Sequence, residues 1–315
     1  MSVSGDGHMG ITVIGAVFID IKGFPLAQYI PGGRNVGNVV QVHGGVSRNI
    51  AEDIGNISLH PNFVSVVDYS GTGIDTIERL KEHGVNTEYK KKKKDGLGIW
   101  LAVFDNNGDV TASISKRPDL MPLRQLLLEK GDELCAKTDS FALEIDLEEE
   151  VLEVIFDLAE KYNKPVYAAV SNMSIAMERR NYLRKVACLV CNLQEAGLLF
   201  SCELENLGID VLKSVLYKKA RDAKIQRMIV TLGERGCIYI DYDSCGYYSA
   251  YSMDVIDTTG AGDAFFAGVA VGLNYGKSMR EAAVIGTRLA SSVIATKEST
   301  CPVFLPEEFG ITVRG

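Results

Sequence analysis

Short apolar runs rich in β-branched residues alternate along this chain with longer stretches in which apolar residues recur at helical spacing. The apolar runs predict strands at 11–14, 63–67, 141–145, 166–170, 188–193 and 228–232. The periodic stretches predict helices at 44–58, 71–84, 151–162 and 281–296. Alternating strands and helices are typical of a parallel sheet with crossover helices, so we expect an α/β fold. The runs 237–241 and 246–251 predict an antiparallel hairpin at its edge.

Two segments break this alternation and predict a second, smaller sheet. From Phe18 to Gln41, short apolar stretches are interrupted by glycines and prolines, which suits small strands and turns. The runs 98–104 and 109–115 flank Asp-Asn-Asn-Gly at 105–108, a hairpin signal. Between these segments stand five consecutive lysines, Lys90 to Lys94, which we interpret as a solvated loop.

Composition limits the classes of partner. The 315 residues are 46% hydrophobic, enough for one large α/β domain or two ordinary ones. The net charge of −8 argues against a nucleic-acid or anionic-membrane surface, and no apolar run approaches the length of a membrane span. A polyanionic substrate would therefore need backbone amides, a metal ion or a few placed cations.

The chain's start and its cysteines predict a cytoplasmic location. Residues 1–8 lack the features of a signal peptide and resemble an expression-tag remnant, which makes Met9 the expected native start. An odd count of seven scattered cysteines indicates reduced thiols. Cys188 and Cys191 form a CxxC, but they lie in a predicted buried strand without further ligands, so we expect neither zinc nor redox chemistry there.

The stretch DTTGAGDAFFAGVAVGL, from Asp257 to Leu273, carries the clearest chemical signal. Gly260, Ala261 and Gly262 predict a tight turn whose amides would form an anion hole at the start of a buried helix. Asp263 could there accept a proton from a hydroxyl while the amides hold a phosphate, which indicates phosphoryl transfer. The alternative is a helix capped by chance, which the costly polar cluster before an apolar helix disfavours. The helix terminus should lower the proton affinity of Asp263.

A second polar cluster lies near the other end of the chain. Asp20 follows the first predicted strand, where ligands of parallel sheets usually bind. Gly44 and Gly45 precede a predicted helix in GGVSRNIAEDIGNIS, in which Ser47 or Asn49 could cap the helix or contact a ligand. Alone, each feature is a weak signal.

Together the two clusters resemble the signatures of the ribokinase-like (PfkB) carbohydrate kinases. The resemblance spans Ile11 to about Phe304 and makes Asp263 the catalytic base. It implies that Asp20, Gly44, Gly45 and Asn49 bind the sugar. It also implies a three-layer sandwich, with a mostly parallel sheet between helices, in a single domain spanning 9–315. A β-sheet lid, from segments 17–43 and 97–117, would cover the sugar and pair two subunits in a homodimer.

The same resemblance implies a Mg-ATP site. Asn192 and Glu195 match an NxxE motif whose Glu helps to position Mg²⁺ through water. Thr231, Gly233 and Gly236 match a TLGxxG turn against the nucleotide, and a small-residue run that includes Ala290 would pack beside adenine. Asp257 and Thr259 match positions that hold a monovalent cation, which implies K⁺. Glu144 or Asp146 could line the pocket, although acids at strand ends often only cap the next helix.

The chain departs from the family pattern after the strand at 166–169, where an Asp-Pro or Asp-x-Asn is frequent. Here the sequence is Ala-Ala-Val-Ser-Asn at 168–172, so a polar contact toward metal or substrate is either missing or supplied by Ser171 or Asn172.

The expected substrate is a ribosyl compound phosphorylated on its primary 5′-hydroxyl. The N-terminal run from Gly15 to Gly55 is similar to that of the pseudouridine kinases, which favours pseudouridine. A ribokinase, a fructokinase or a purine-nucleoside kinase of the same family remain the alternatives. A non-catalytic nucleoside-binding regulator is a further alternative from another class, which the presence of Asp263 between its glycines disfavours.

Overall fold

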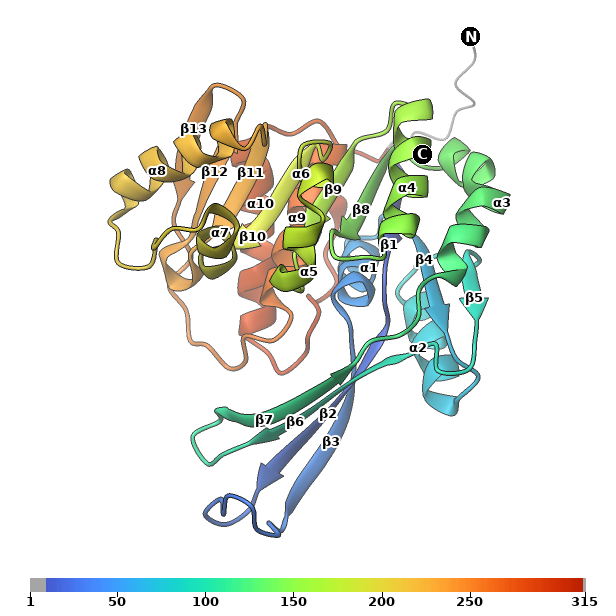
Figure 1. Ribbon diagram of the computed structural model, residues 1–315, viewed down its shortest axis with the longest axis vertical. Helices are drawn as coiled ribbons and strands as arrows, with labels where there is room; N and C mark the ends of the chain where they lie inside the picture. The colour runs from blue at the N-terminus through green and yellow to red at the C-terminus, as the bar shows by residue number, and fades with distance from the viewer. Residues whose placement is uncertain (1–9, 314–315) are drawn as a thin grey trace.

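The computed structural model describes residues 10–313, so the expected tag at 1–8 and Met9 lie outside the described residues. A nine-stranded sheet forms its centre, in the order β13-β12-β11-β10-β9-β8-β1-β4-β5 (Figure 1). Its strands are β1 (Ile11–Ile14), β4 (Asn62–Val67), β5 (Lys90–Lys92), β8 (Ser140–Glu144), β9 (Val166–Ala169), β10 (Cys188–Asn192), β11 (Arg227–Thr231), β12 (Cys237–Asp241) and β13 (Ser244–Tyr248). The pairs β11·β12 and β12·β13 are antiparallel and the others parallel, which confirms the predicted sheet and its edge hairpin.

Helices cover both faces of this sheet and make three layers. One apolar core joins the sheet to α3 (Pro122–Ala136), α4 (Glu149–Lys161), α5 (Met173–Glu178), α6 (Arg180–Leu183), α7 (Leu193–Phe200) and α8 (Ile209–Asp222). The other core joins it to α1 (Val46–Asn56), α2 (Gly71–Glu82), α9 (Ala261–Asn274) and α10 (Met279–Ile294). The polar clusters around Asp20 and Asp263 both lead into helices of the second layer.

A separate four-stranded sheet extends away from this body, in the order β3-β2-β6-β7 (Figure 1). Its strands are β2 (Phe18–Pro25), β3 (Gly37–Gly44), β6 (Gly98–Phe104) and β7 (Val110–Lys116). β2 leaves the carboxyl end of β1, and β3 runs directly into α1. The small sheet is thereby anchored at the carboxyl edge of the large one, where the expected ligand site lies.

The prediction of a solvated loop for the five lysines holds for Lys93 and Lys94, which are exposed and outside any strand, but is wrong for the first three. Lys90–Lys92 form β5, which pairs in parallel with β4 at the end of the large sheet. Lys91 forms an ion pair with Glu129, and Lys93 with Asp119. An edge strand can carry such a run because one side of its backbone is paired while its side chains reach solvent, and charge there opposes edge-to-edge association.

The small residues of α10 serve two purposes, of which the sequence predicted one. Gly286 packs against α9 so closely that a Cβ on Gly268 would lie 2.7 Å from its backbone. Ala282 meets Gly272 in the same way, at 2.9 Å. These residues therefore allow two buried helices to approach, whereas Ala290 and Ser291 line a cavity. The expectation that the whole run lies beside a nucleotide is wrong for its first half.

The cysteines form no disulfide in the part of the chain that the structure describes. Cys188 and Cys191 are buried in β10, and burial raises the pKa of the Cys188 thiol to about 12. Residues 10–313 contain no cluster of three metal-binding side chains and no helix long and apolar enough to span a membrane.

Candidate active site

The turn before α9 is built as the sequence predicts. Gly260 adopts a left-handed conformation with φ of 83°, and Ala264 begins the helical ladder by donating to its carbonyl at 2.9 Å. A Cβ on Gly260 would lie 1.9 Å from the carbonyl oxygen of Ser299. Both the backbone conformation and the close approach therefore require glycine. The backbone N–H of Ala261 donates to the carbonyl of Thr258 at 3.2 Å, so the later amides of the first turn of α9 are the candidate donors for an anion.

Asp263 lies in that first turn and contacts α1. The side-chain amide of Asn49 donates to its Oδ2 at 2.6 Å. Burial raises the pKa of Asp263 to about 7, and the negative charges of Glu144 and Asp20 act in the same direction. The net shift is upward, so burial outweighs the groups that lower the proton affinity of Asp263, and the separate effect expected of the helix terminus stays a prediction.

The start of α1 brings the predicted sugar-binding residues together. Gly45 is the N-cap with φ of 99°, and a Cβ there would lie 2.8 Å from the backbone nitrogen of Phe18. A Cβ on Gly44 would lie 2.6 Å from a carboxylate oxygen of Asp20, so the diglycine leaves room for that carboxylate. Burial raises the pKa of Asp20. Asp20, Gly44 and Asn49 thus gather beside Asp263 from β2, β3, α1 and α9.

Ser47 and Glu144 are engaged with each other. The backbone nitrogen and hydroxyl of Ser47 donate to Oε1 of Glu144, at 3.1 and 2.6 Å. Ser47 therefore does not cap α1, since the N-cap is Gly45 without a side-chain bond. Glu144 is 6% exposed, and burial raises its pKa. We infer that it fixes the first turn of α1 behind the site.

A cavity of about 840 Å³ opens on the other side of the turn, large enough for a nucleotide. Six predicted residues line it: Thr231, Gly233, Gly236, Ala261, Gly262 and Ala290. Ala290 lines it from α10, together with Thr287 and Ser291. Sequence reasoning missed the wall formed by Tyr251, Met253 and Val255. Its signal was the apolar character of Met253 and Val255, which lie between the predicted strand that ends at Tyr251 and the turn.

Asn192 and Glu195 form a capping box at the start of α7. Glu195 donates its backbone N–H to the Asn192 side chain at 2.8 Å and accepts from the Asn192 N–H at 2.7 Å. Neither residue lines the cavity of about 840 Å³. Burial and the nearby charge of Asp146 raise the pKa of Glu195. Such a carboxylate fits an ion that keeps its waters and is held mainly by substrate phosphates.

Asp257 and Thr259 border a second cavity of about 240 Å³ beneath β2 and β3, together with Asp20. The N–H of Thr259 donates to Asp257 at 2.8 Å. Burial works to raise the pKa of Asp257, but this bond and the charge of Lys22 outweigh it, and the pKa is lowered. An ionised carboxylate fits a monovalent cation, and Lys22 and Lys297 line the same cavity.

At the departure from the family pattern, Ser171 contacts a carboxylate. Its hydroxyl donates to Oδ2 of the buried Asp146 at 3.0 Å, and Arg117 also pairs with that carboxylate at 3.1 Å. Asn172 caps α5 by accepting from Ile175. Both side chains that were expected to supply the missing contact are thus used within the protein.

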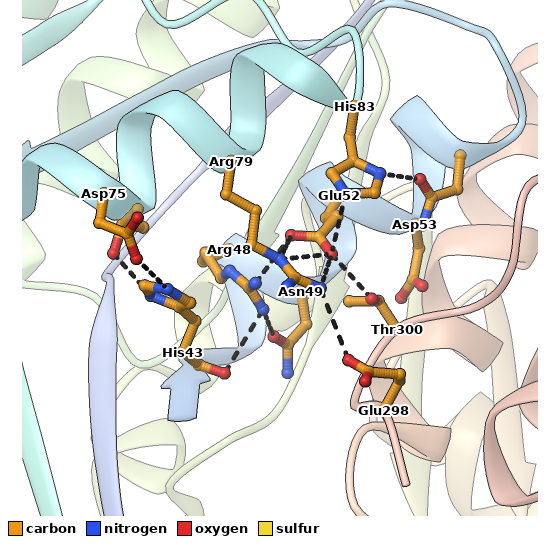
Figure 2. Close-up of polar contacts among 12 residues, drawn as sticks. His43, Arg48, Asn49, Glu52, Asp53, Asp75, Arg79, His83, Glu298 and Thr300 are labelled. Atoms are coloured by element: carbon orange, nitrogen blue, oxygen red, sulfur yellow. Dashed lines mark hydrogen bonds and ion pairs between the residues drawn. The ribbon is translucent and has the colours of Figure 1, made fainter. Parts of the chain in front are cut away.

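A charged network on α1 was missed altogether. Arg48, Glu52 and Asp53 are each at most 1% exposed, although their side chains are ionisable (Figure 2). The signal in the sequence was an Arg and a Glu four residues apart in a helix whose isoleucines recur at core spacing.

Comparison with known proteins agrees with this geometry. Residues 10–305 match the pfkB family carbohydrate kinases. The chain is 32% identical over 294 residues to a guanosine-inosine kinase of Exiguobacterium acetylicum, covering 92% of this chain and 95% of that protein. It is 25% identical over 279 residues to the pseudouridine kinase of Escherichia coli, covering 86% and 87%.

Solved structures share the fold. The Arabidopsis thaliana ribokinase complexed with ribose and ATP superposes with a TM-score of 0.80 at 18% identity, covering 96% of this chain and 98% of that one. The ribokinase-like arrangement of a large, mostly parallel sheet with a separate four-stranded sheet is therefore confirmed. With the family signatures at both ends and the match over nearly its whole length, the chain belongs to the pfkB family of carbohydrate kinases, phosphotransferases with an alcohol group as acceptor.

Proposed function

We propose that this kinase transfers the γ-phosphoryl group of ATP to the primary 5′-hydroxyl of a nucleoside, with Asp263 as the general base. The observation that carries the proposal is the position of Asp263. It stands in the first turn of α9, which borders the expected nucleotide cavity. On the side where Asp20 lies, the amide nitrogen of Asn49 donates to Oδ2 of Asp263 at 2.6 Å. One carboxylate thus separates the expected phosphate donor from the expected sugar.

Each part of the site then has a definite task. Asp20 accepts hydrogen bonds from ribose hydroxyls, and the diglycine lets the ribose approach the backbone. Asp263 orients the 5′-hydroxyl and accepts its proton, while the amides that follow Gly260 hold the transferred group. Mg-ATP supplies the electrophilic phosphoryl group. Because the attacking oxygen bonds late in a loose transition state, positioning and charge stabilisation matter more than a strong base.

We propose a purine nucleoside, guanosine or inosine, as the first substrate to test. The support is the 32% identity to the guanosine-inosine kinase, which extends over 92% of this chain. Pseudouridine is the second candidate, favoured by the N-terminal run from Gly15 to Gly55 and by the 25% identity to a pseudouridine kinase. A site built to pair a base N–H discriminates strongly against an analogue that leaves a buried acceptor unpaired.

A panel of substrates tests this proposal. ADP release would be measured with guanosine, inosine, pseudouridine, uridine, adenosine, ribose and fructose at equal Mg-ATP. We expect the highest kcat/KM for guanosine or inosine, exceeding that for free ribose by more than about 100-fold because the base contributes binding. A preference for pseudouridine would select the second candidate, and a preference for ribose or fructose would refute the nucleoside assignment while leaving the kinase family intact.

We also propose K⁺ as an activator held beside Asp257 and Thr259. The ionised Asp257 and the polar cavity around it support this site. The competing arrangement is that an ammonium group of Lys22 or Lys297 takes the place of the ion, because both line the cavity. Either cation would stabilise the loop that leads into the anion hole.

The small sheet is proposed as a lid and as the interface of a homodimer. Val39 on β3 and Ile114 on β7 are 72% and 70% exposed, and their neighbours Val36, Val40, Val42, Leu101 and Val110 are exposed too. A two-layer contact between copies would cover these side chains, which a small isolated sheet cannot bury by itself. The cytoplasmic location predicted from unpaired cysteines stays a prediction.

A further inference from the structure

Helix α1 buries three ionisable side chains directly behind the site. Arg48 is 1% exposed, and Glu52 and Asp53 are 0% exposed. Burial of a charge is costly unless it is paired and hydrogen-bonded, so the partners of these groups indicate which role compensates for the cost of burial. Arg48 and Glu52 lie one helical turn apart and pair at 2.7 Å.

The guanidinium of Arg48 reaches three partners through two separate nitrogens. Its Nη2 donates to Glu52, and its Nη1 donates to Oδ1 of Asn49 at 2.6 Å and to the carbonyl of His43 at 3.5 Å (Figure 2). A guanidinium only donates, so the amide oxygen of Asn49 has to face it. The amide nitrogen of Asn49 must then point the other way, toward Oδ2 of Asp263 at 2.6 Å.

Glu52 does not depend on Arg48 for a partner. Arg79 donates to it from two nitrogens, at distances between 2.8 and 3.1 Å, and the hydroxyl of Thr300 donates at 2.8 Å. Meanwhile Nε of Arg48 is buried with no hydrogen-bond partner among the residues that the structure describes. Stability alone therefore gives no reason to bury this arginine, because an unsatisfied donor is costly and Glu52 is already neutralised.

We propose that Arg48 is a positioning residue for phosphoryl transfer: its forked guanidinium fixes the amide of Asn49, which holds one oxygen of Asp263 and leaves the other for the substrate hydroxyl. Glu52, held by Arg79 and Thr300, keeps the fork in place. Thr300 follows Ser299, whose carbonyl backs Gly260, so the same network reaches the wall of the anion-hole turn. This inference rests on the proposed role of Asp263 as base.

The electrostatics of the site agree with this role. Burial raises the pKa of Asp263, as do Glu144 at the end of β8 and Asp20 on β2, whereas the Asn49 bond and the charge of Arg48 lower it. Asp53 on α1 is a further carboxyl near Asp263. Removal of Arg48 would take away its charge and loosen the Asn49 bond, so the pKa of Asp263 should rise and the acid limb of the pH profile should move to higher pH.

The test compares Arg48→Met, Asn49→Ala and the double variant with Arg227→Met. Arg227 is a matched control because it pairs with Asp241 at 2.8 Å at the amino end of β11, away from the site. We expect Arg48→Met to lower kcat by about 10- to 100-fold, as misplacement of a reacting group does, with a smaller change in nucleoside KM. In the Asn49→Ala background the same change should cost less than about twofold, because Arg48 acts through Asn49.

Two outcomes would overturn the proposal. One is a kcat of Arg48→Met within about twofold of the wild type; the other is an equal loss with and without Asn49, which would make the two residues independent. If Arg48→Met does not fold, Arg48→Lys keeps the charge but replaces the fork by a single ammonium. A folded Arg48→Lys variant should then show a lower kcat and a shifted acid limb, and wild-type kinetics in it would refute the need for the fork.

The variant Asp263→Asn separates this inference from the function on which it rests. If Asp263→Asn is inactive and Arg48→Met is unaffected, only the positioning role is wrong. If Asp263→Asn stays active, Asp263 is not the base and both proposals are wrong.

Discussion

The amide nitrogen of Asn49 lies 2.6 Å from Oδ2 of Asp263, although the two residues are 214 positions apart in the chain. This bond joins the first turns of α1 and α9, the two helices that follow the diglycine and the Gly260 turn. It leaves the second carboxylate oxygen of Asp263 for another partner. The predictions that follow depend on this geometry.

Replacement of Asp263 by Asn should abolish turnover while nucleoside binding persists. The amide keeps the shape of the carboxylate but cannot accept the proton, so we expect a loss of about 10²- to 10⁴-fold in kcat. Binding can be followed by the fluorescence of the single tryptophan, Trp100, which pairs with Asp20 across β2 and β6. A loss of turnover below about tenfold would remove Asp263 from the role of base.

The pH profile should show an acid limb near neutrality. The base must be ionised, and since burial raises the pKa of Asp263 to about 7, the active form is lost as the pH falls through that value. We expect kcat/KM to drop about tenfold for each unit below it, because kcat/KM reports the free enzyme. The measurement needs coupling enzymes that are checked with added ADP at each pH. A profile that stays flat down to pH 5 would contradict this assignment.

Alanine at Gly260 should unfold the turn, whereas alanine at Gly262 should not. Gly260 has a positive φ and lies against Ser299, while a Cβ on Gly262 meets no atom within 4 Å. The Tm of Gly260→Ala should therefore fall by several degrees, because the substitution lowers the free energy of unfolding by about 1–2 kcal/mol or more. Gly262→Ala should keep its Tm but lose activity, because its methyl group would stand where the phosphate binds. An unchanged kcat in Gly262→Ala would place the phosphate elsewhere.

Potassium should activate the enzyme. An ion beside Asp257 and Thr259 would order the loop that carries the anion hole, so rates in KCl should exceed those in tetramethylammonium chloride at equal ionic strength severalfold. Equal rates in the two salts would count against the ion and favour the ammonium groups of Lys22 and Lys297. In that case Lys22→Met should reduce kcat in tetramethylammonium chloride, and K⁺ should partly restore it.

The protein should sediment as a dimer that a charge on the small sheet disrupts. Ile114→Glu would place a carboxylate in the apolar contact, where burial without a partner is costly. Val303→Glu is the matched control, since Val303 is 71% exposed but lies outside the small sheet. We expect a monomer for Ile114→Glu and a dimer for Val303→Glu in sedimentation velocity at micromolar concentration. A wild-type monomer under these conditions would refute the interface.

The sequence by itself determined the alternation of strands and helices, the small sheet and the Gly260 turn. Each rests on local causes: β-branched apolar runs, the Asp-Asn-Asn-Gly turn at 105–108 and glycines that alone allow the required φ. The two signatures also located Asp20, Asn49 and Asp263, because motif residues keep their spacing within one turn or helix. The prediction for Lys90–Lys92 was wrong because local charge gives no information on strand pairing, and β5 forms through its pairing with β4.

Only the tertiary structure decided which polar groups face one another and how they titrate. The pKa of Asp263 depends on burial and on carboxyls from β2 and β8, and no local pattern contains these distances. The sequence did not show that Arg48 is buried with Asn49 and Glu52 as partners, nor that Arg79 of α2 and Thr300 after α10 hold Glu52. Desolvation and long-range pairing are properties of the packed molecule, so this network could be found only there.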